Sequence, residues 1–186
     1  PPLRRCMSEF APSRFHGASG RNVVVCSDNK IKIINDGGQE IAEYDLKEDK
    51  ILASTAFGDF VVVSFSGDVS AKGSELGVLD IGAINAEKDT ISERFDHDGN
   101  NNDSIFKWDR RLEGFIEAIG SMEDSFIFSL KGLGIYSMGI SRNGKEIEIN
   151  ENWRLGYPEW NGKMAAGFVD GVATITASDR HVQVIS

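Results

Sequence analysis

Residues 115–138 read FIEAIGSMEDSFIFSLKGLGIYSM, and this stretch decides the fold. It divides into three short runs, Phe115–Gly120, Ser125–Leu130 and Leu133–Met138, separated by a Met-Glu-Asp turn and a Lys-Gly pair. Short runs rich in Ile and Phe and bounded by turn residues are typical of β-strands. The stretch therefore predicts three antiparallel strands, and its apolar middle run is expected to be buried between two neighbouring layers.

The same order of strand, Gly or Asp turn, apolar strand, short turn and alternating strand recurs along the chain. The second strand of each copy is anchored at Val23, Val61, Ser125 and Val172, which are 38, 64 and 47 residues apart. Two of these spacings are close to the ~40–45 residues of a four-stranded propeller blade. A Gly/Ser-rich loop at 66–74 and the segment around 96–112 explain the long one. The repeat divides residues 20–186 into units at about 20–48, 50–112, 113–152 and 163–186.

These units resemble the blades of WD40-like β-propellers. The resemblance rests on AFGDFVVVSFSG (56–67) with LGVLDI (76–81), on GSMEDSFIFSLKG (120–132) with LGIYSM (133–138), and on GFVDGVATITASDRHVQVI (167–185). The Gly-His dipeptide of that family is absent, and the one Trp-Asp pair, Trp108-Asp109, follows an insertion. The resemblance implies an all-β fold with blades of four antiparallel strands. It also implies a role like that of scaffold propellers in trafficking, nuclear-pore or RNA-processing complexes.

The number of units predicts an incomplete or split propeller. One blade cannot bury both of its faces alone, so blades stack around a ring. The first unit lacks a clear innermost strand and the last lacks an outer one. The two chain ends share one blade, or another polypeptide or a second copy of the chain closes the ring. A β-sandwich or barrel of short strands is the alternative fold, and only the blade-like spacings argue against it.

Residues 1–19 contain three of the four prolines and no sustained periodicity, which predicts an irregular N-terminal arm. Arg4, Arg5 and Arg14 in this arm indicate a solvated segment rather than a nucleic-acid site. The formal net charge of the chain is −9, which disfavours nucleic acid as a direct partner because the negative field repels phosphates.

Two cysteines, Cys6 and Cys26, form no cluster, which favours a reduced intracellular compartment, either the cytoplasm or the nucleus. No apolar run approaches the ~20 residues of a membrane span. The N-terminus lacks the apolar region of a signal peptide. A viral or secreted structural β-protein is a further alternative, and it would need a signal upstream of Pro1.

A polar loop, DHDGNNNDS at 96–104, is the candidate metal site. It carries oxygen ligands at alternating positions, namely Asp96, Asp98, Asn100 and Asp103. Such ligands can wrap Ca²⁺. The loop departs from a standard calcium loop because Gly99 comes early and no bidentate Glu closes it. We therefore expect a solvated insertion and no cofactor, with calcium as the alternative.

The candidate partner-binding residues lie in an aromatic-rich segment at 151–163, which is expected to connect two units. They are Trp153, Arg154, Tyr157 and Trp160. Loop aromatics beside Arg are typical of interaction hot spots, although the same residues could cap the ring or fill a gap between blades.

The sequence shows no HExxH, GxSxG or phosphate-loop motif, so no catalytic residue is predicted. We therefore expect a non-catalytic scaffold that binds protein partners in a multiprotein complex. A propeller enzyme or ligand-binding domain, with calcium at Asp96–Asp103, is the alternative.

Overall fold

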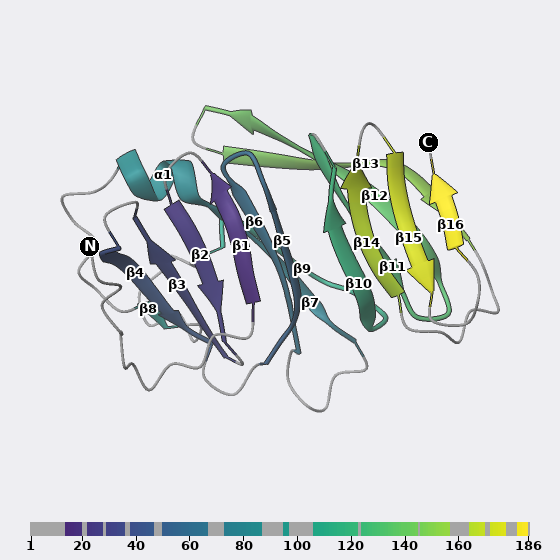
Figure 1. Cartoon of the computed structure of the whole chain (residues 1–186), viewed down its shortest axis with the longest axis horizontal. Coiled ribbons are helices and arrows are strands. Elements are labelled where there is room, and N and C mark those ends of the chain that lie inside the picture. The colour runs from purple at the N-terminus through teal and green to yellow at the C-terminus, as the bar shows by residue number, and fades with distance from the viewer. Residues whose placement is uncertain are drawn as a thin grey trace.

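A computed structural model of the chain consists almost wholly of β-strands in four separate sheets (Figure 1). It describes residues 14–19, 22–27, 29–35, 38–46, 50–66, 73–86, 95–96, 106–122, 124–144, 146–156, 164–169, 172–177 and 182–185. The four sheets do not form the two packed layers of a β-sandwich. The prediction of four-stranded antiparallel blades in an incomplete propeller is confirmed.

Sheet A has the strand order β1-β2-β3-β4-β8. The first four strands pair antiparallel, and β8 pairs parallel with β4. The bounds of these strands are β1 Arg14–Ser19, β2 Asn22–Cys26, β3 Lys30–Ile34, β4 Glu40–Asp45 and β8 Phe95–Asp96. The sheet therefore has an innermost strand, which the sequence pattern did not indicate.

The prediction of an irregular arm over residues 1–19 is wrong for residues 14–19, which form β1. The physical reason lies in the neighbouring strand. Each edge of β2 presents backbone N–H and C=O groups that need partners, so β1 forms a ladder with it although its own sequence does not alternate.

Sheet B has the order β5-β6-β7-β9, and all of its pairs are antiparallel. Its strands are β5 Ile51–Phe57, β6 Phe60–Phe65, β7 Glu75–Asp80 and β9 Trp108–Arg111. The outer position of sheet B belongs to β9, whereas Phe95 pairs with sheet A. The Trp108-Asp109 pair thus lies beside the third strand of its sheet after all.

A short helix, α1 Ile81–Ala86, begins directly where β7 ends. The side chain of Asp80 accepts a hydrogen bond of 3.1 Å from the backbone N–H of Ala83. This bond satisfies an N–H in the first turn of the helix, which would otherwise have no partner. Asp80 therefore ends the strand and caps the helix.

Sheet C has the order β10-β11-β12-β13 and is antiparallel throughout. Its strands are β10 Ile116–Ser121, β11 Ser125–Leu130, β12 Gly134–Asn143 and β13 Glu146–Leu155. The last two have ten residues each and form a long hairpin. Ser137 pairs with Trp153 while Met138 pairs with Glu151, so Asn152 is an extra residue in β13. Such a bulge bends and twists a strand.

Sheet D has three strands within the described residues, in the order β14-β15-β16. Their bounds are β14 Met164–Val169, β15 Val172–Ala177 and β16 Val182–Ile185. The four inner strands β1, β5, β10 and β14 lie next to one another in this order (Figure 1). No comparable contact joins β1 to β14 among the described strands. The described blades therefore form an open array.

Among the described residues, two apolar clusters lie one on each face of sheet B. Val61, Val63 and Phe65 of β6 belong to the cluster shared with sheet A, whereas Val62 belongs to the cluster shared with sheet C. Successive side chains of a strand point to opposite faces, so an apolar run is needed to fill both layers. All six residues of β11 are buried, which confirms the prediction that Ser125–Leu130 lies between neighbouring blades.

Candidate functional site

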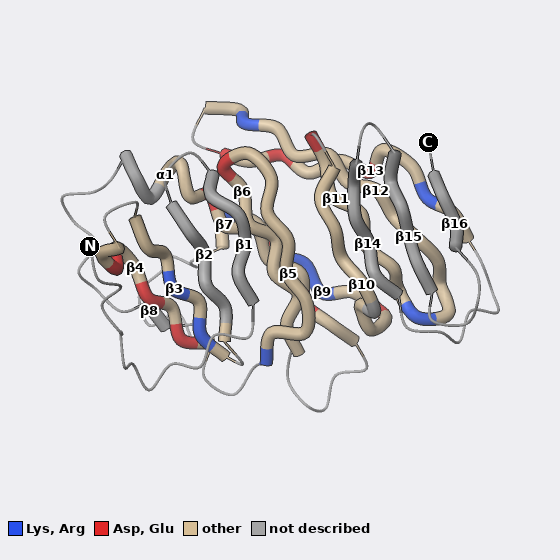
Figure 2. Tube along the Cα trace, viewed as in Figure 1, with Lys and Arg blue, Asp and Glu red and all other residues tan. Residues whose placement is uncertain are grey.

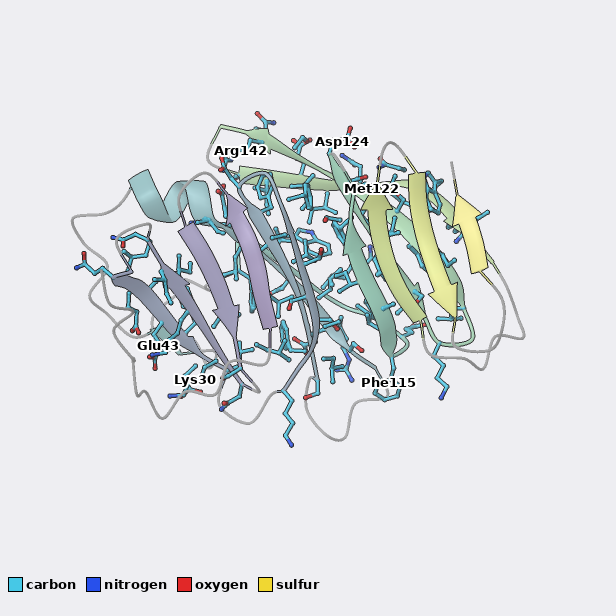
Figure 3. The ribbon with its side chains drawn as sticks, viewed as in Figure 1. Lys30, Glu43, Phe115, Met122, Asp124 and Arg142 are labelled. Carbon is cyan, nitrogen blue, oxygen red and sulfur yellow. The ribbon has the colours of Figure 1, made fainter. Side chains whose placement is uncertain are left out.

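Three large apolar side chains are exposed at one end of sheet C. They are Phe115, Leu133 and Leu155, with exposed fractions of 50%, 47% and 39%. No other large apolar side chain is exposed among those that the structure describes. We call these three residues the sheet C rim. Phe115 lies at the lower edge of the molecule in Figure 3, opposite Arg142 and Asp124.

Tight turns place the rim residues at this end. Leu133 lies in the turn between β11 and β12, between two glycines with φ of 72° and 134°. The N–H of Lys131 donates to the carbonyl of Phe115 at 3.0 Å, which fixes the turn beside the start of β10. A side chain on Gly134 would collide with the carbonyl oxygen of Leu155. The rim is therefore held by backbone contacts, and its apolar side chains are left free to contact a partner.

The structure places Trp153 and Arg154 within β13 instead of in a connection between blades, so the expected loop is wrong at this point. Trp153 is half-buried and pairs with Ser137. Arg154 is exposed, and its Nε lies 3.9 Å from the carboxylate of Glu151. Tyr157 and Trp160 lie outside the described residues. A role of these four residues in binding a partner stays a prediction.

The candidate calcium loop lies almost wholly outside the described residues. The backbone of Asp96 belongs to β8, while Asp98, Asn100 and Asp103 are not described. Within the described part of the chain, no group of three or more His, Cys, Asp or Glu side chains is arranged to hold a metal ion. Calcium binding by Asp96–Asp103 therefore stays a prediction.

The opposite end of sheet C carries an ionic cluster that joins it to sheet B. Arg142 of β12 donates from Nε to Asp80 at 3.0 Å and forms a second, very short contact with the same carboxylate. It also donates to Asp59 at 3.1 Å and lies over the ring of Phe60, 5.1 Å from its centre. The hydrogen bonds to Asp80 raise the pKa of Arg142 above its ordinary value. The cluster fixes the two blades and shows no accessible reactive group.

A second ionic cluster covers the outward side of sheet A, where lysines of β3 lie beside acidic residues of β4 (Figure 2). Lys32 contacts Glu40 at 2.8 Å and Glu43 at 2.7 Å. These hydrogen bonds, first the one to Glu40, raise the pKa of Lys32. The hydrogen bond from Lys32 lowers the pKa of Glu43. Because all these charges are mutually paired, the cluster stabilises the sheet and is a poor candidate for a binding site.

Comparisons with known proteins find the fold but no sequence family. No family of known proteins matches the chain, and no curated protein sequence does. The computationally designed Ika4 protein is similar in structure, with a TM-score of 0.57 at 14% identity over 96% of this chain and 92% of that one. AztD of Citrobacter koseri has a TM-score of 0.54 at 12% identity over 94% of this chain. The Neurospora crassa Pan2 WD40 domain has a TM-score of 0.50 at 10% identity over 91% of this chain.

These similarities establish the class of fold, a β-propeller with WD40-like blades. The chain spans 43% of AztD and 48% of the Pan2 domain, less than half of either, although it spans nearly all of the designed protein. Among the described residues, no helix has the length and apolar character that a membrane crossing requires.

The exposed rim was not found from the sequence, although a signal was present. Phe115 stands at the start of an apolar run and Leu133 within another, and such runs indicate buried strands. However, Leu133 is flanked by Gly132 and Gly134, and a residue between two turn glycines points away from the sheet. An apolar residue at the tip of a tight turn is the pattern that could have identified the rim.

Proposed function

We propose that this chain is a non-catalytic propeller module that binds a protein partner through the sheet C rim. The observation that carries the proposal is the gathering of Phe115, Leu133 and Leu155 at one end of one sheet. Large apolar side chains left in water at a common site are typical of protein interaction surfaces. Burying them against a partner would gain the hydrophobic free energy that folding has not used.

The neighbourhood of the rim supports a protein partner rather than a small ligand. The side chain of Leu133 extends across β11 toward β10. A Cβ added at Gly114, two residues before β10, would lie 3.4 Å from the Cδ1 atom of Leu133. Glu113, Lys131 and Arg154, all exposed, lie within two residues of a rim residue in the sequence. An apolar centre with a charged border is the usual composition of a protein–protein interface. The proposal includes an intracellular location, in the cytoplasm or nucleus, and a partner that could be a chain completing the ring or a second copy.

The test is affinity capture with a rim variant, Phe115→Ser with Leu133→Ser, compared with the wild-type chain by quantitative mass spectrometry. Because both side chains are exposed, the variant should fold normally while losing the partner. Asp124→Ser is the matched control, since Asp124 is exposed at the opposite end of sheet C (Figure 3). The proposal is wrong if the rim variant captures the same proteins as the wild type, or if the control loses them as well.

A further inference from the structure

The sides of sheets B and C that face each other carry two aromatic and two basic residues near the outer edges of the sheets. On sheet B, Trp108 and Arg110 pair with Val78 and Leu76, which belong to the core layer between the two sheets. Residues paired across an antiparallel ladder point to the same face. Trp108 and Arg110 therefore lie on the face of sheet B that is turned toward sheet C.

The same register argument applies to sheet C. Tyr136 pairs on one side with Phe128, a member of the same core layer, and on the other side with Arg154. Tyr136 and Arg154 therefore lie on the face of sheet C that is turned toward sheet B. We call Trp108, Arg110, Tyr136 and Arg154 the outer seam. Both aromatic residues pack against the shared core layer and are half-buried, while both arginines are exposed.

The arginines of the outer seam lack the partners that other cations of the chain possess. Arg142 is held by two carboxylates, and Lys32 by two others. Among the described residues, no carboxylate pairs with Arg110, and Arg154 has only the 3.9 Å contact with Glu151. Figure 2 shows the basic residues of β9 in blue, of which Arg111 lies on the opposite face of sheet B. In a chain with 29 acidic and 20 basic residues, two exposed arginines with so few carboxylate partners among the described residues are candidates for binding an anionic partner.

The aromatic residues give this site a fixed shape. Tyr136 stacks on Phe128 with ring centres 5.3 Å apart and an angle of 12° between the ring planes. Trp108 lies on a strand held by four register pairs to β7. A guanidinium group binds a carboxylate through two parallel N–H donors, and planar aromatic faces support such a group by stacking. Half-buried Trp and Tyr beside Arg are the residues most often found at interaction hot spots.

We propose that the outer seam binds an acidic peptide segment of the partner, an inference that rests on the proposed function of the sheet C rim. Arg154 and Leu155 are consecutive residues of β13 and point to opposite faces of sheet C, so a partner segment that contacts both must pass over the end of the sheet. Its apolar side chains would contact Leu133 and Leu155, and its carboxylates would pair with Arg110 and Arg154. The net charge of −9 disfavours a polyanion such as a nucleic acid, whose phosphates would meet the field of the whole molecule.

The experiment measures fluorescence anisotropy of a labelled glutamate-rich peptide with a central Phe-Leu pair, and of its counterpart with lysine in place of glutamate. The acidic peptide should bind saturably, with an affinity that falls as salt is added, because salt screens exposed charges. The lysine counterpart should not bind. Arg110→Glu with Arg154→Glu should weaken binding at least about tenfold, since two charge-assisted hydrogen-bonded contacts are lost.

Arg111→Glu provides the matched control. Arg111 is exposed on the same strand, but its pairing with Glu75 places it on the opposite face of sheet B. This variant should bind the acidic peptide within about twofold of the wild-type affinity, because an exposed charge on the far face contributes little. If the double variant fails to fold, Arg110→Gln, which removes one exposed and unpaired charge, serves in its place.

Several results would overturn the inference. They are equal binding of both peptides, no binding up to about 1 mM acidic peptide, an equal loss with Arg111→Glu, or binding of a single-stranded oligonucleotide or anionic vesicle in preference to the peptide. The inference can fail while the proposed function stands. In that case the rim variant loses the captured partner, whereas the Arg110→Glu, Arg154→Glu variant retains it.

Discussion

Arg142 and Asp80 form a bidentate polar contact between two blades of this chain. Arg142 lies near the tip of the long β12–β13 hairpin, and Asp80 is the last residue of β7. The contact uses two guanidinium nitrogens and both carboxylate oxygens, and Asp80 also caps α1. A bidentate pair of this kind fixes orientation as well as distance. The hairpin of sheet C is thereby tied to the end of sheet B.

Replacing Arg142 by Ala is expected to lower the free energy of unfolding by about 1.5–3 kcal/mol, because a nearly buried carboxylate loses its charged donors. Urea denaturation of the wild type and variant measures this difference. Asp59→Asn is the control, since Asp59 makes one exposed contact with Arg142 and should cost at most about 1 kcal/mol. An Arg142→Ala variant as stable as the wild type would contradict the assignment.

A double-mutant cycle isolates the pair itself. Asp80→Ala also removes the cap of α1. The loss in free energy of unfolding from this substitution alone should therefore exceed the coupling energy between Asp80 and Arg142. The coupling energy of Arg142→Ala and Asp80→Ala is expected to be about 1 kcal/mol or more, as for other residues that share a hydrogen-bonded network. Simple additivity of the two single effects would show that the blades are held together elsewhere.

The blades could be predicted from the sequence because their middle strands are apolar on both faces. The second strands anchored at Val23, Val61, Ser125 and Val172 are β2, β6, β11 and β15, each second in its sheet. A short apolar run between turn signals is consistent with a strand between two layers, and its length and its β-branched or aromatic residues favour a strand over a helix. The buried middle strands of the blades can therefore be predicted from the local pattern of apolar residues in the sequence.

The parts that could not be predicted depend on long-range pairing. β1 forms because β2 needs a partner, and β9 completes sheet B only after the chain returns from residues 95–96 in sheet A. The Arg142–Asp80 contact joins residues 62 positions apart. No window of sequence contains both members of such a pair. The outer seam depends on register in the same way, since only strand pairing places Arg110 and Arg154 on the sides of sheets B and C that face each other.

Gly77 is expected to be indispensable for packing within sheet B. A Cβ at this position would lie 2.5–2.7 Å from atoms of the Phe106 ring. That ring is buried and stacks on Phe65 with centres 5.2 Å apart, so it cannot move aside. Gly77→Ala should destabilise the fold by about 1–3 kcal/mol through overpacking. Thermal denaturation measures the loss, and a Gly77→Ala variant with wild-type stability would contradict this packing.

Gly156→Ala is the control for that substitution. Nothing lies within 4 Å of a Cβ added at Gly156, which lies just beyond the end of β13. Gly156→Ala should change the free energy of unfolding by no more than about 0.5 kcal/mol, as for other surface substitutions. A loss equal to that of Gly77→Ala would show that contact with Phe106 is not the cause of the destabilisation.

The Lys32–Glu43 pair predicts a dependence of stability on acid. The pKa of Glu43 in the folded chain lies below its ordinary value of 4.5, chiefly because Lys32 donates a hydrogen bond to it. The contribution of Glu43 to the free energy of unfolding is therefore fully present above pH 4.5. It is lost as the pH falls through the lower pKa that Glu43 has in the folded chain. At high pH the opposite dependence applies to Lys32, whose pKa is raised. Its contribution to the free energy of unfolding is fully present below pH 10.5 and is lost as the pH rises through the higher pKa of the folded chain.

Glu43→Gln tests the acid half of this dependence. The stability difference between wild type and variant should be constant from neutral pH to about pH 5 and should shrink below it. Denaturation curves over this range measure the difference. Glu146→Gln is the control, since Glu146 is exposed and no described group pairs with it. A difference that persists unchanged into strong acid would show that Glu43 is not held by Lys32.

Leu130 and Leu133 should respond in opposite ways to the same loss of apolar side chain. Leu130 is buried in the layer between sheets B and C, whereas Leu133, three residues later, is exposed at the rim. Leu130→Ala should cost about 2–5 kcal/mol, because it leaves a cavity. Leu133→Ala should change stability by about 0.5 kcal/mol or less while weakening partner capture. Urea denaturation measures the first effect and capture the second. If Leu133→Ala destabilises the chain as much as Leu130→Ala, then Leu133 belongs to the core and the rim is no binding surface.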